Sequence, residues 1–334
     1  MRLRRILTVG ICVAWLTGCG GETDSPLGTR GSPVATQPLE SYSTALLSQL
    51  LAFYGEPVAF VPRFDVSAYR IVYLTVDARG AVVEASGALF LPVGSDNLPM
   101  ISLQHIIQTE RTAVASVSPL EYGPDAILAA SAGYAACAPD YLGLGTTSEG
   151  MHPYLHAGAS ANAVMDFVRA CRVFCAGQGI TLNGRLFLAG YSEGAYATLA
   201  AQRAMEAEPA REFPITAVAC LSGPYDVEGT TTAILADPGN RNVAYFAFML
   251  VAYDDIYGWD QLDRMFREPY AGQVGGLFDG SHPIGDVEDA LRGTVDDLVS
   301  PDFRTRYAAG LETNVLAAVR ANTLLDWRPV APIR

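Results

Sequence analysis

Ser192 is the residue of this sequence whose surroundings point most directly to chemistry. It stands in the pentapeptide GYSEG at residues 190–194, which fits the pattern G-x-S-x-G. A serine in this pattern acts as a nucleophile that attacks a carbonyl carbon and forms an acyl-enzyme. The backbone N–H of the following residue, Glu193, would hold the oxyanion that develops in that attack. The pattern therefore predicts acyl-transfer chemistry at Ser192.

The segments on either side of Ser192 have the character that this chemistry requires. Residues 186–191 are mostly apolar and predict a strand, whereas residues 193–208 predict a helix. Small residues at 190, 194 and 195 would let the helix and the neighbouring strands approach a sharp turn, with Ser192 at the positive end of the helix dipole. A chance five-residue match is the alternative, and the strand before and the helix after Ser192 argue against it.

The rest of the chain alternates short apolar segments with helical ones. Strands are predicted at residues 69–77, 81–92, 100–107, 135–140, 186–191 and 215–221, and helices at residues 41–54, 124–132, 157–176 and 193–208. The first two strands form a hairpin, and the alternation that follows predicts a mostly parallel sheet with helices on both faces.

A long helical region follows residue 223. About a hundred residues pass before residues 331–334 resemble the start of another strand. Residues 243–253 are apolar all round and predict a buried core helix, although such a run could also line a pocket for an apolar substrate, and both interpretations can hold. Residues 286–299 predict an acidic amphipathic helix.

Several segments together resemble the α/β-hydrolases and, within them, the secretory lipase family. They are YLTVD at residues 73–77, PDYLGLG at 139–145, HPY at 152–154 and SGPYD at 222–226. The resemblance spans residues 65–334 and implies an α/β-hydrolase domain over residues 41–334 with a helical cap inserted after the sixth strand, at residues 228–326. It also implies hydrolysis of esters or lipids through an acyl-enzyme.

A second oxyanion donor is expected in the loop after the third predicted strand. The family usually has His-Gly-Thr there, but this chain has HIIQT at residues 105–109. A β-branched residue does not easily adopt the positive φ that glycine permits, so the loop would be reshaped. Gln108 is our candidate for the second donor.

The catalytic acid and histidine should follow the serine along the chain. His282 is the sole histidine after Ser192 and is our candidate base, with a surface turn at residues 280–283 as the alternative. Asp226 is the candidate acid, with a turn at the start of the cap as the alternative. His105, His152 and His156 precede Ser192, and we expect packing or loop roles for them.

The chain ends at Arg334, within the seventh strand that the resemblance implies. We therefore expect a hydrolase truncated at its C-terminus, with the last strands missing and the acid and histidine beyond residue 334. A naturally degenerate relative is the alternative. Without a base, we expect the 334-residue form to hydrolyse short esters at background rate and to aggregate.

The N-terminus predicts export. Arginines at positions 2, 4 and 5 precede an apolar stretch at residues 6–16, as in a signal peptide over residues 1–18. Residues 16–19, LTGC, resemble the bacterial lipobox, which implies lipidation of Cys19 and, with Gly20 next to it, an outer-membrane location. Residues 19–40 are rich in Gly, Pro, Ser and Thr, and predict a flexible tether.

Composition excludes several other classes of protein. The chain has 334 residues with 50% hydrophobic and 17% charged side chains, which is typical of a globular protein. All 22 basic residues are arginine, so a Schiff-base lysine, a pyridoxal phosphate anchor and a P-loop lysine are excluded. The formal charge of −13 disfavours nucleic acid as a partner. Zinc and calcium motifs are absent from the sequence, so we expect no metal and no cofactor.

Taken together, the sequence predicts a serine-dependent hydrolase of carboxylic esters, a lipase or esterase of lipid catabolism. Its partners would be a small-molecule or lipid ester as substrate and the membrane of the bacterial cell envelope, held through Cys19. The competing hypothesis is a catalytically inactive lipoprotein that keeps the hydrolase scaffold and cap as a binding surface.

Overall fold

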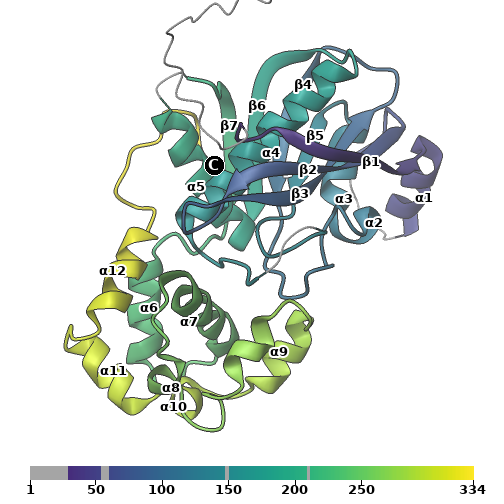
Figure 1. The fold of residues 1–334 in the computed structure, drawn as a ribbon. Helices are drawn as coiled ribbons and strands as arrows, with labels where there is room; N and C mark the ends of the chain where they lie inside the picture. The colour runs from purple at the N-terminus through teal and green to yellow at the C-terminus, as the bar shows by residue number, and fades with distance from the viewer. Residues whose placement is uncertain (1–28, 54–59, 147–149, 209–210) are drawn as a thin grey trace, which may run out of the picture.

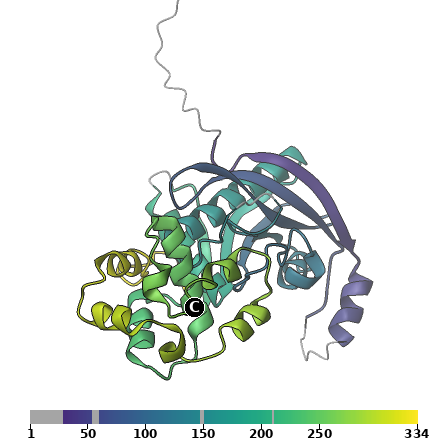
Figure 2. The same ribbon diagram turned by 60° about the horizontal axis from the view of Figure 1, so that its bottom comes forward.

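The computed structural model describes residues 29–53, 60–146, 150–208 and 211–334. The predicted signal peptide, Cys19 and residues 19–28 of the predicted tether lie outside these residues. A mixed sheet with helices on its faces forms the body of the molecule, and a second group of helices forms a lobe beside it (Figures 1 and 2).

The sheet has seven strands in the order β1-β2-β3-β5-β4-β6-β7. Antiparallel pairing joins β1 to β2, β2 to β3 and β3 to β5, whereas β5, β4, β6 and β7 are parallel. The strands are β1 (Pro33–Tyr42), β2 (Val66–Val76), β3 (Val82–Pro92), β4 (Leu98–Gln104), β5 (Ala135–Pro139), β6 (Leu182–Tyr191) and β7 (Ile215–Leu221). The predicted hairpin and α/β fold are confirmed, and the parallel part of this mixed sheet consists of β5, β4, β6 and β7.

The strand predicted at residues 100–107 was too long at its end. In the structure β4 stops at Gln104, which pairs with Gly190 near the end of β6. The chain of β6 turns sharply just beyond that point, so residues 105–107 have no strand beside them to pair with.

Helices cover both faces of the sheet. In β5, Cys137 packs in one apolar cluster with α4 (Ala157–Gly177) and α5 (Glu193–Ala207), whereas Ala136 and Ala138 pack in another cluster with α3 (Pro124–Ser131). Because successive strand residues point to opposite faces, α3 and the pair α4 and α5 lie on opposite sides. Two further helices, α1 (Thr44–Phe53) and α2 (Pro119–Tyr122), lie on the α3 side.

Part of the predicted tether belongs to the fold. Residues 33–40 were expected to be tether, but they lie in β1, which pairs with β2 from Pro33 opposite Tyr73 to Tyr42 opposite Val66. The prediction was wrong here because β1 is an edge strand with mostly exposed side chains, so it shows little apolar alternation. An edge strand also tolerates prolines, and the pairing is irregular next to Pro33 and Pro38.

The lobe consists of the chain that follows β7. Its helices are α6 (Val227–Ala236), α7 (Val243–Tyr257), α8 (Leu262–Met265), the 3-10 helix η1 (Val274–Phe278), α9 (Ile284–Ala290), α10 (Val295–Leu298), α11 (Pro301–Ala308) and α12 (Thr313–Ala321). The helical insertion expected after the sixth strand of the resemblance is therefore present, since β7 is that strand.

The two predictions for helices of the lobe had different outcomes. Residues 243–253 lie in α7, whose side chains are nearly all buried in the lobe's core, as predicted. The single helix expected at residues 286–299 is wrong, because the segment forms α9 and α10 with a break between them. At Thr294 a capping box with Asp297 starts a new helix, and this cap interrupts the acidic amphipathic pattern.

The end of the chain pairs with the outer edge of β7. Arg334 donates its backbone N–H to Val218 at 3.0 Å and accepts from Cys220 at 2.9 Å, and Ile333 forms a parallel bridge with Val218. The start of a strand predicted at residues 331–334 is confirmed to this extent. Among the helices of the described residues, none is long and apolar enough to cross a membrane.

Candidate active site

Ser192 lies on the sharp turn between β6 and α5. Its φ and ψ are 57° and −122°, a conformation that non-glycine residues seldom adopt and that often marks a functional site. The backbone N–H of Ser192 donates to the carbonyl of Leu221 at the end of β7, 2.9 Å away. Ser192 is half-buried, so the strained turn places its hydroxyl at the end of the parallel strands.

Glycines on either side make this turn sterically possible. A Cβ at Gly190 would collide with the carbonyl of Gly194, and a Cβ at Gly194 would collide with the carbonyl of Gln104 in β4. The start of α5 therefore packs directly against the ends of β4 and β6. This close approach is the reason for the two glycines in the predicted pattern.

The first turn of α5 supplies an oxyanion donor. As the first residue of the helix, Glu193 has a backbone N–H with no acceptor inside the helix. Ala195 and Tyr196 donate their N–H groups back to the Ser192 carbonyl, which fixes the direction of the turn. The geometry is consistent with the role predicted for the Glu193 N–H.

Gln108 lies in the loop after β4 and lines a cavity of about 360 Å³. Gly190, Tyr191 and Leu221 line the same cavity, so Gln108 faces the end of β6 immediately before Ser192. On either side of Gln108, Ile107 and Thr109 are buried. Gln108 and the end of β6 therefore border the same cavity.

The loop after β4 is held from the lobe as well. Thr109 donates its hydroxyl to the backbone carbonyl of His282 at 2.8 Å, and Glu110 forms an antiparallel bridge with Ser281. Arg111 donates its guanidinium to the carbonyls of Gly143 and Asp279. His282 is thus in contact with the candidate oxyanion loop through its main chain.

The candidate acid and base are not brought together. Asp226 is exposed and caps α6, accepting from the N–H of Gly229 at 2.7 Å, which agrees with the alternative of a turn at the start of the cap. His282 is half-buried in the lobe. Among the residues that the structure describes, neither side chain forms a hydrogen bond with Ser192.

Two other histidines have the packing and loop roles expected for them. The His105 ring contacts the carbonyls of Ile106 and Asp140 and packs against Tyr141. His156 accepts from the N–H of Ala159 and so caps α4, and burial lowers its pKa.

His152 and the side chain of Glu193 form a buried pair that the sequence analysis missed. The imidazole Nε2 lies 2.6 Å from Glu193 Oε1, and Nδ1 lies 2.8 Å from the carbonyl of Leu142. Burial alone would lower the pKa of His152, but the charge and hydrogen bond of Glu193 raise it on balance. The sequence held part of the signal, because an acid at a closely packed helix start needs a partner, but it did not identify His152 as that partner.

The PDYLGLG segment at residues 139–145 packs against the backbone of His152 and so positions this pair. The Asp140 carboxylate accepts from the hydroxyls of Ser86 and Ser116, and its burial raises its pKa. Gly143 has a φ of 78°, and a Cβ there would collide with the backbone of His152. This segment of the resemblance is therefore structural, and it fixes the position of His152.

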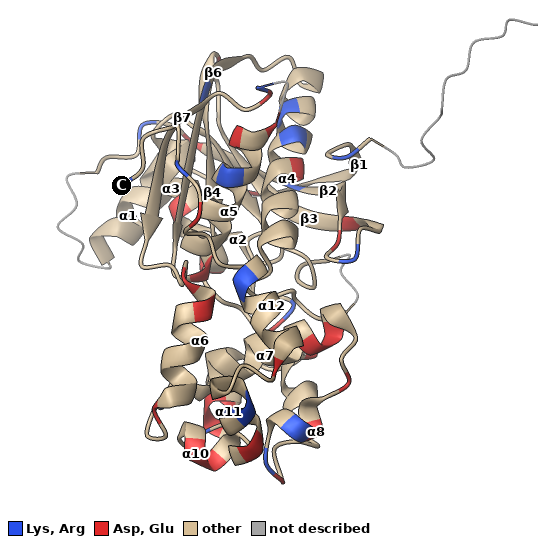
Figure 3. Cartoon of the chain, turned by 90° about the vertical axis from the view of Figure 1, so that its left-hand side faces the viewer, with Lys and Arg blue, Asp and Glu red and all other residues tan. Residues whose placement is uncertain are grey.

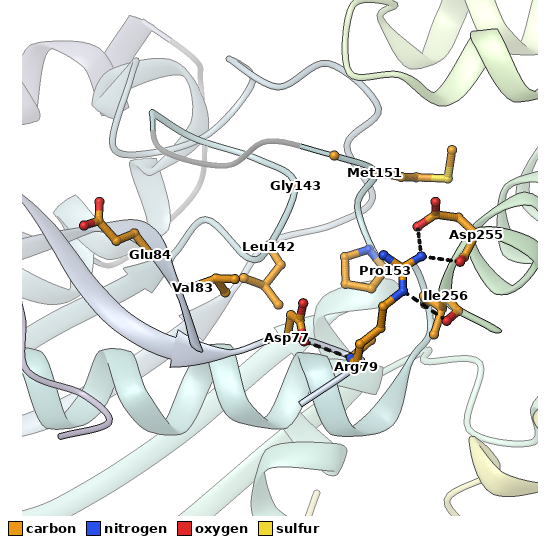
Figure 4. A pocket seen from close by; sticks show the side chains of 12 residues that line it. Asp77, Arg79, Val83, Glu84, Leu142, Gly143, Met151, Pro153, Asp255 and Ile256 are labelled. Atoms are coloured by element: carbon orange, nitrogen blue, oxygen red, sulfur yellow. Dashed lines mark hydrogen bonds and ion pairs between the residues drawn. The ribbon is translucent and has the colours of Figure 1, made fainter. Parts of the chain in front are cut away.

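A second contact region joins the β2–β3 hairpin to the lobe. Arg79 donates to the carbonyls of Asp255 and Ile256 at the end of α7 and pairs with the Asp255 carboxylate at 3.2 Å (Figure 4). A pocket of about 400 Å³ lies there between the hairpin, the lobe and the segment around Pro153. A cation at a helix C-terminus is favourable, so Arg79 helps to hold the lobe on the body.

Charged residues of both signs lie on the body and on the lobe. Figure 3 marks acidic residues on α6 and α10 of the lobe, and arginines on α8 and α11 of the lobe as well as on α4 of the body. Arg169 of α4 pairs with the buried Asp166 at 2.6 Å and with Glu212 at 2.6 Å.

Comparison with known proteins bears on the fold and on the class of reaction. The sequence profile of the secretory lipase family matches residues 124–234, which include Ser192. No match is found among curated proteins.

Solved structures are similar over most of the chain. The rice cell wall degrading esterase LipA from Xanthomonas oryzae has 27% identity and a TM-score of 0.82, over 92% of this chain and 82% of LipA. A Legionella pneumophila protein assigned as a hydrolase has 27% identity and a TM-score of 0.81, over 90% and 82% of the two chains.

A more distant structure shares the fold alone. Candida antarctica lipase A has 14% identity and a TM-score of 0.64, over 92% of this chain and 69% of the lipase. The chain therefore has the α/β-hydrolase fold, and its similarity to secretory lipases and to the LipA esterase supports a carboxylic ester hydrolase.

Proposed function

We propose that this chain is a serine hydrolase of carboxylic esters that acts through an acyl-enzyme on Ser192. The observation that carries the proposal is the strained conformation of Ser192 between β6 and α5, at the N-terminus of that helix. Strain of this kind is retained where it positions a reacting group. The family resemblance and the ester hydrolases with similar structures support the same reaction class.

The proposed reaction has two steps. The Ser192 hydroxyl attacks the ester carbonyl, its proton passes to a base, and the alcohol leaves with a proton while the acyl group stays on the serine. Water then hydrolyses the acyl-enzyme and releases the acid. The N–H groups of Glu193 and Gln108 would stabilise the oxyanion in both steps, and each such contact contributes about 3 kcal/mol in comparable enzymes.

Asp226 and His282 stay the candidate acid and base within the described residues. His282 reaches the oxyanion loop through its carbonyl, whereas Asp226 is engaged in capping α6. Replacement of each by asparagine tests them, since loss of a triad member removes most of the rate of serine hydrolysis.

We also propose that the protein is lipid-anchored at the bacterial cell envelope through Cys19, in the outer membrane. The support is the sequence of residues 1–20 alone. Cys19→Ser should release the protein from membranes, and fractionation of cells expressing each form tests this proposal.

A fluorophosphonate probe tests the catalytic proposal directly. The probe phosphonylates an activated serine with loss of fluoride. Labelling of Ser192 in the folded 334-residue chain would support the proposal and would contradict the expectation that this form lacks a base. Ser192→Ala should abolish the label, and heat-denatured protein should not react. A folded chain that binds esters but leaves Ser192 unlabelled would support the competing hypothesis of a non-catalytic binding protein.

A further inference from the structure

The pair formed by His152 and Glu193 lies directly behind the nucleophile. Glu193 follows Ser192 in the chain, and its side chain is 1% exposed. His152 is 5% exposed and comes from the segment between β5 and α4. The two side chains meet at 2.6 Å across the interface of that segment with α5. Neither group takes part in the proposed reaction itself.

The hydrogen-bond partners show that one proton must lie between the two groups. The carbonyl of Leu142 can only accept, so Nδ1 of His152 must carry a proton that it donates there. The neutral ring would then present the Nε2 lone pair to a carboxylate oxygen, which is repulsive. At 2.6 Å a proton therefore joins Nε2 and Oε1.

The Glu193 carboxylate depends on this one contact. Within the described part of the chain, its second oxygen, Oε2, is buried and has no hydrogen-bond partner. A buried carboxylate without a partner is costly, so His152 supplies the charge compensation for it. The carboxylate that His152 compensates belongs to the same residue as the N–H that would stabilise an oxyanion.

The groups around the pair do not compete for the proton. The titratable side chains that face Glu193 are the phenols of Tyr141, Tyr154 and Tyr196, and burial raises the pKa of each well above its usual value. An apolar neighbour on the lobe side is Phe248 of α7, whose ring centre lies 5.9 Å from that of His152. The phenols stay neutral, so they add no charge beside the hydrogen bond between His152 and Glu193.

The position of His152 is fixed from both sides. Its ring stacks on Tyr141 of the body, at 5.7 Å and 16°, and contacts Phe248 of the lobe. Gly143 leaves space for its backbone. A ring held this firmly can hold Glu193, and with it the peptide that follows Ser192.

We propose that His152 is a positioning residue for Ser192, which shares one proton with the Glu193 carboxylate and thereby fixes the peptide that carries the oxyanion donor. This inference rests on the proposed role of Ser192 as nucleophile. It assigns to the Glu193 side chain a task distinct from that of its backbone N–H.

The test uses Glu193→Gln and His152→Gln in the full chain, with His156→Gln as a control that removes another imidazole of the same segment. Fluorophosphonate labelling rates are measured from pH 5 to 9. In Glu193→Gln an amide N–H can donate to neutral Nε2 at every pH. The ratio of the wild-type rate to the Glu193→Gln rate should therefore be constant at low pH and fall as pH rises through the pKa of His152.

His152→Gln should label about tenfold more slowly than wild type, since small displacements of reacting groups have large effects on rate. The control His156→Gln should keep the wild-type pH profile. A flat ratio for Glu193→Gln, together with unchanged labelling of His152→Gln, would overturn the proposal.

Two measurements test, independently of labelling, whether His152 and Glu193 share a proton. Proton NMR of the wild type should show a strongly downfield imidazole N–H that disappears in Glu193→Gln. Because the pKa of His152 is raised in the folded state, the stability of the wild type relative to Glu193→Gln should be greatest below the unfolded pKa of histidine, about 6.5, and fall at higher pH. If wild-type Ser192 is not labelled, the proposed function is wrong, but the shared proton is not affected. If the downfield N–H and the pH dependence of stability are both absent, the shared proton is wrong.

Discussion

The two faces of the sheet next to Ser192 are supported very differently. On the face covered by α4 and α5, Leu186 and Leu188 of β6 are 1% exposed and Val218 of β7 is 3% exposed. On the other face, Tyr191 is 57% exposed and Leu221 is 55% exposed, and both line the cavity that contains Gln108. The nucleophile's turn is therefore held from one side, and the opposite side is open.

The packed face therefore positions the Ser192 turn, whereas the open face leaves the turn accessible. The packed face holds the glycines, the start of α5 and the buried pair of His152 and Glu193. The open face holds the loop after β4 and the cavity beside the strand ends. Changes on the packed face should alter both stability and reactivity, whereas changes on the open face should leave the fold intact.

The largest effect is expected at Gly194. In Gly194→Val the new side chain would meet the backbone carbonyls of Gln104 and His105, which cannot move without disturbing β4. We expect a loss of about 4 kcal/mol in the free energy of unfolding and no labelling of Ser192. Urea denaturation and probe labelling check both outcomes.

Gly177→Val is the matched control for that prediction. A Cβ at Gly177, the last residue of α4, meets nothing within 4 Å. This variant should lose less than about 1 kcal/mol and keep the wild-type labelling rate. Equal losses for the two variants would show that the close approach at Gly194 is unimportant.

A pair of leucine truncations compares the two faces themselves. Leu188→Ala leaves a cavity under α5 and should cost about 3 kcal/mol, whereas Leu221→Ala on the open face should cost about 0.5 kcal/mol. Denaturant midpoints and slopes of the two variants provide the measurement. Similar costs would mean that the exposed face is covered in solution.

The smallest effect is expected where the lobe meets the hairpin. Arg79→Met removes an exposed ion pair with Asp255 and two hydrogen bonds to the end of α7. We expect a loss of less than about 1 kcal/mol that diminishes in high salt, and labelling within about twofold of wild type. Arg79→Lys should recover part of the loss. A strong fall in labelling would show that the lobe also positions Ser192.

The parts of the fold predicted from sequence were those with local patterns. Ser192 was found because its turn is encoded within five residues, and α7 because its apolar residues are continuous. Edge strand β1 could not be predicted in this way, since its register depends on β2, more than twenty residues further on.

The site was predicted less completely for the same reason. His152 and Glu193 are 41 residues apart, and nothing in either segment alone reveals that they meet. The contact of Thr109 with His282 joins segments separated by 173 residues. Such pairs are set by the packing of the lobe and the strand order, which become visible only in the folded chain.

Strand β1 limits how far the body could move from a membrane. If Cys19 carries the proposed lipid, the chain from Cys19 to Pro33 can span at most about 50 Å, because an extended residue covers no more than about 3.6 Å. A tether reaching residue 40 would have spanned about 75 Å by the same measure. β1 and β7 are the two outer strands of the sheet. The segment from Cys19 to Pro33 therefore joins the sheet at one edge, and the lobe follows the strand at the opposite edge. Such an arrangement would let the lobe face away from the anchoring membrane.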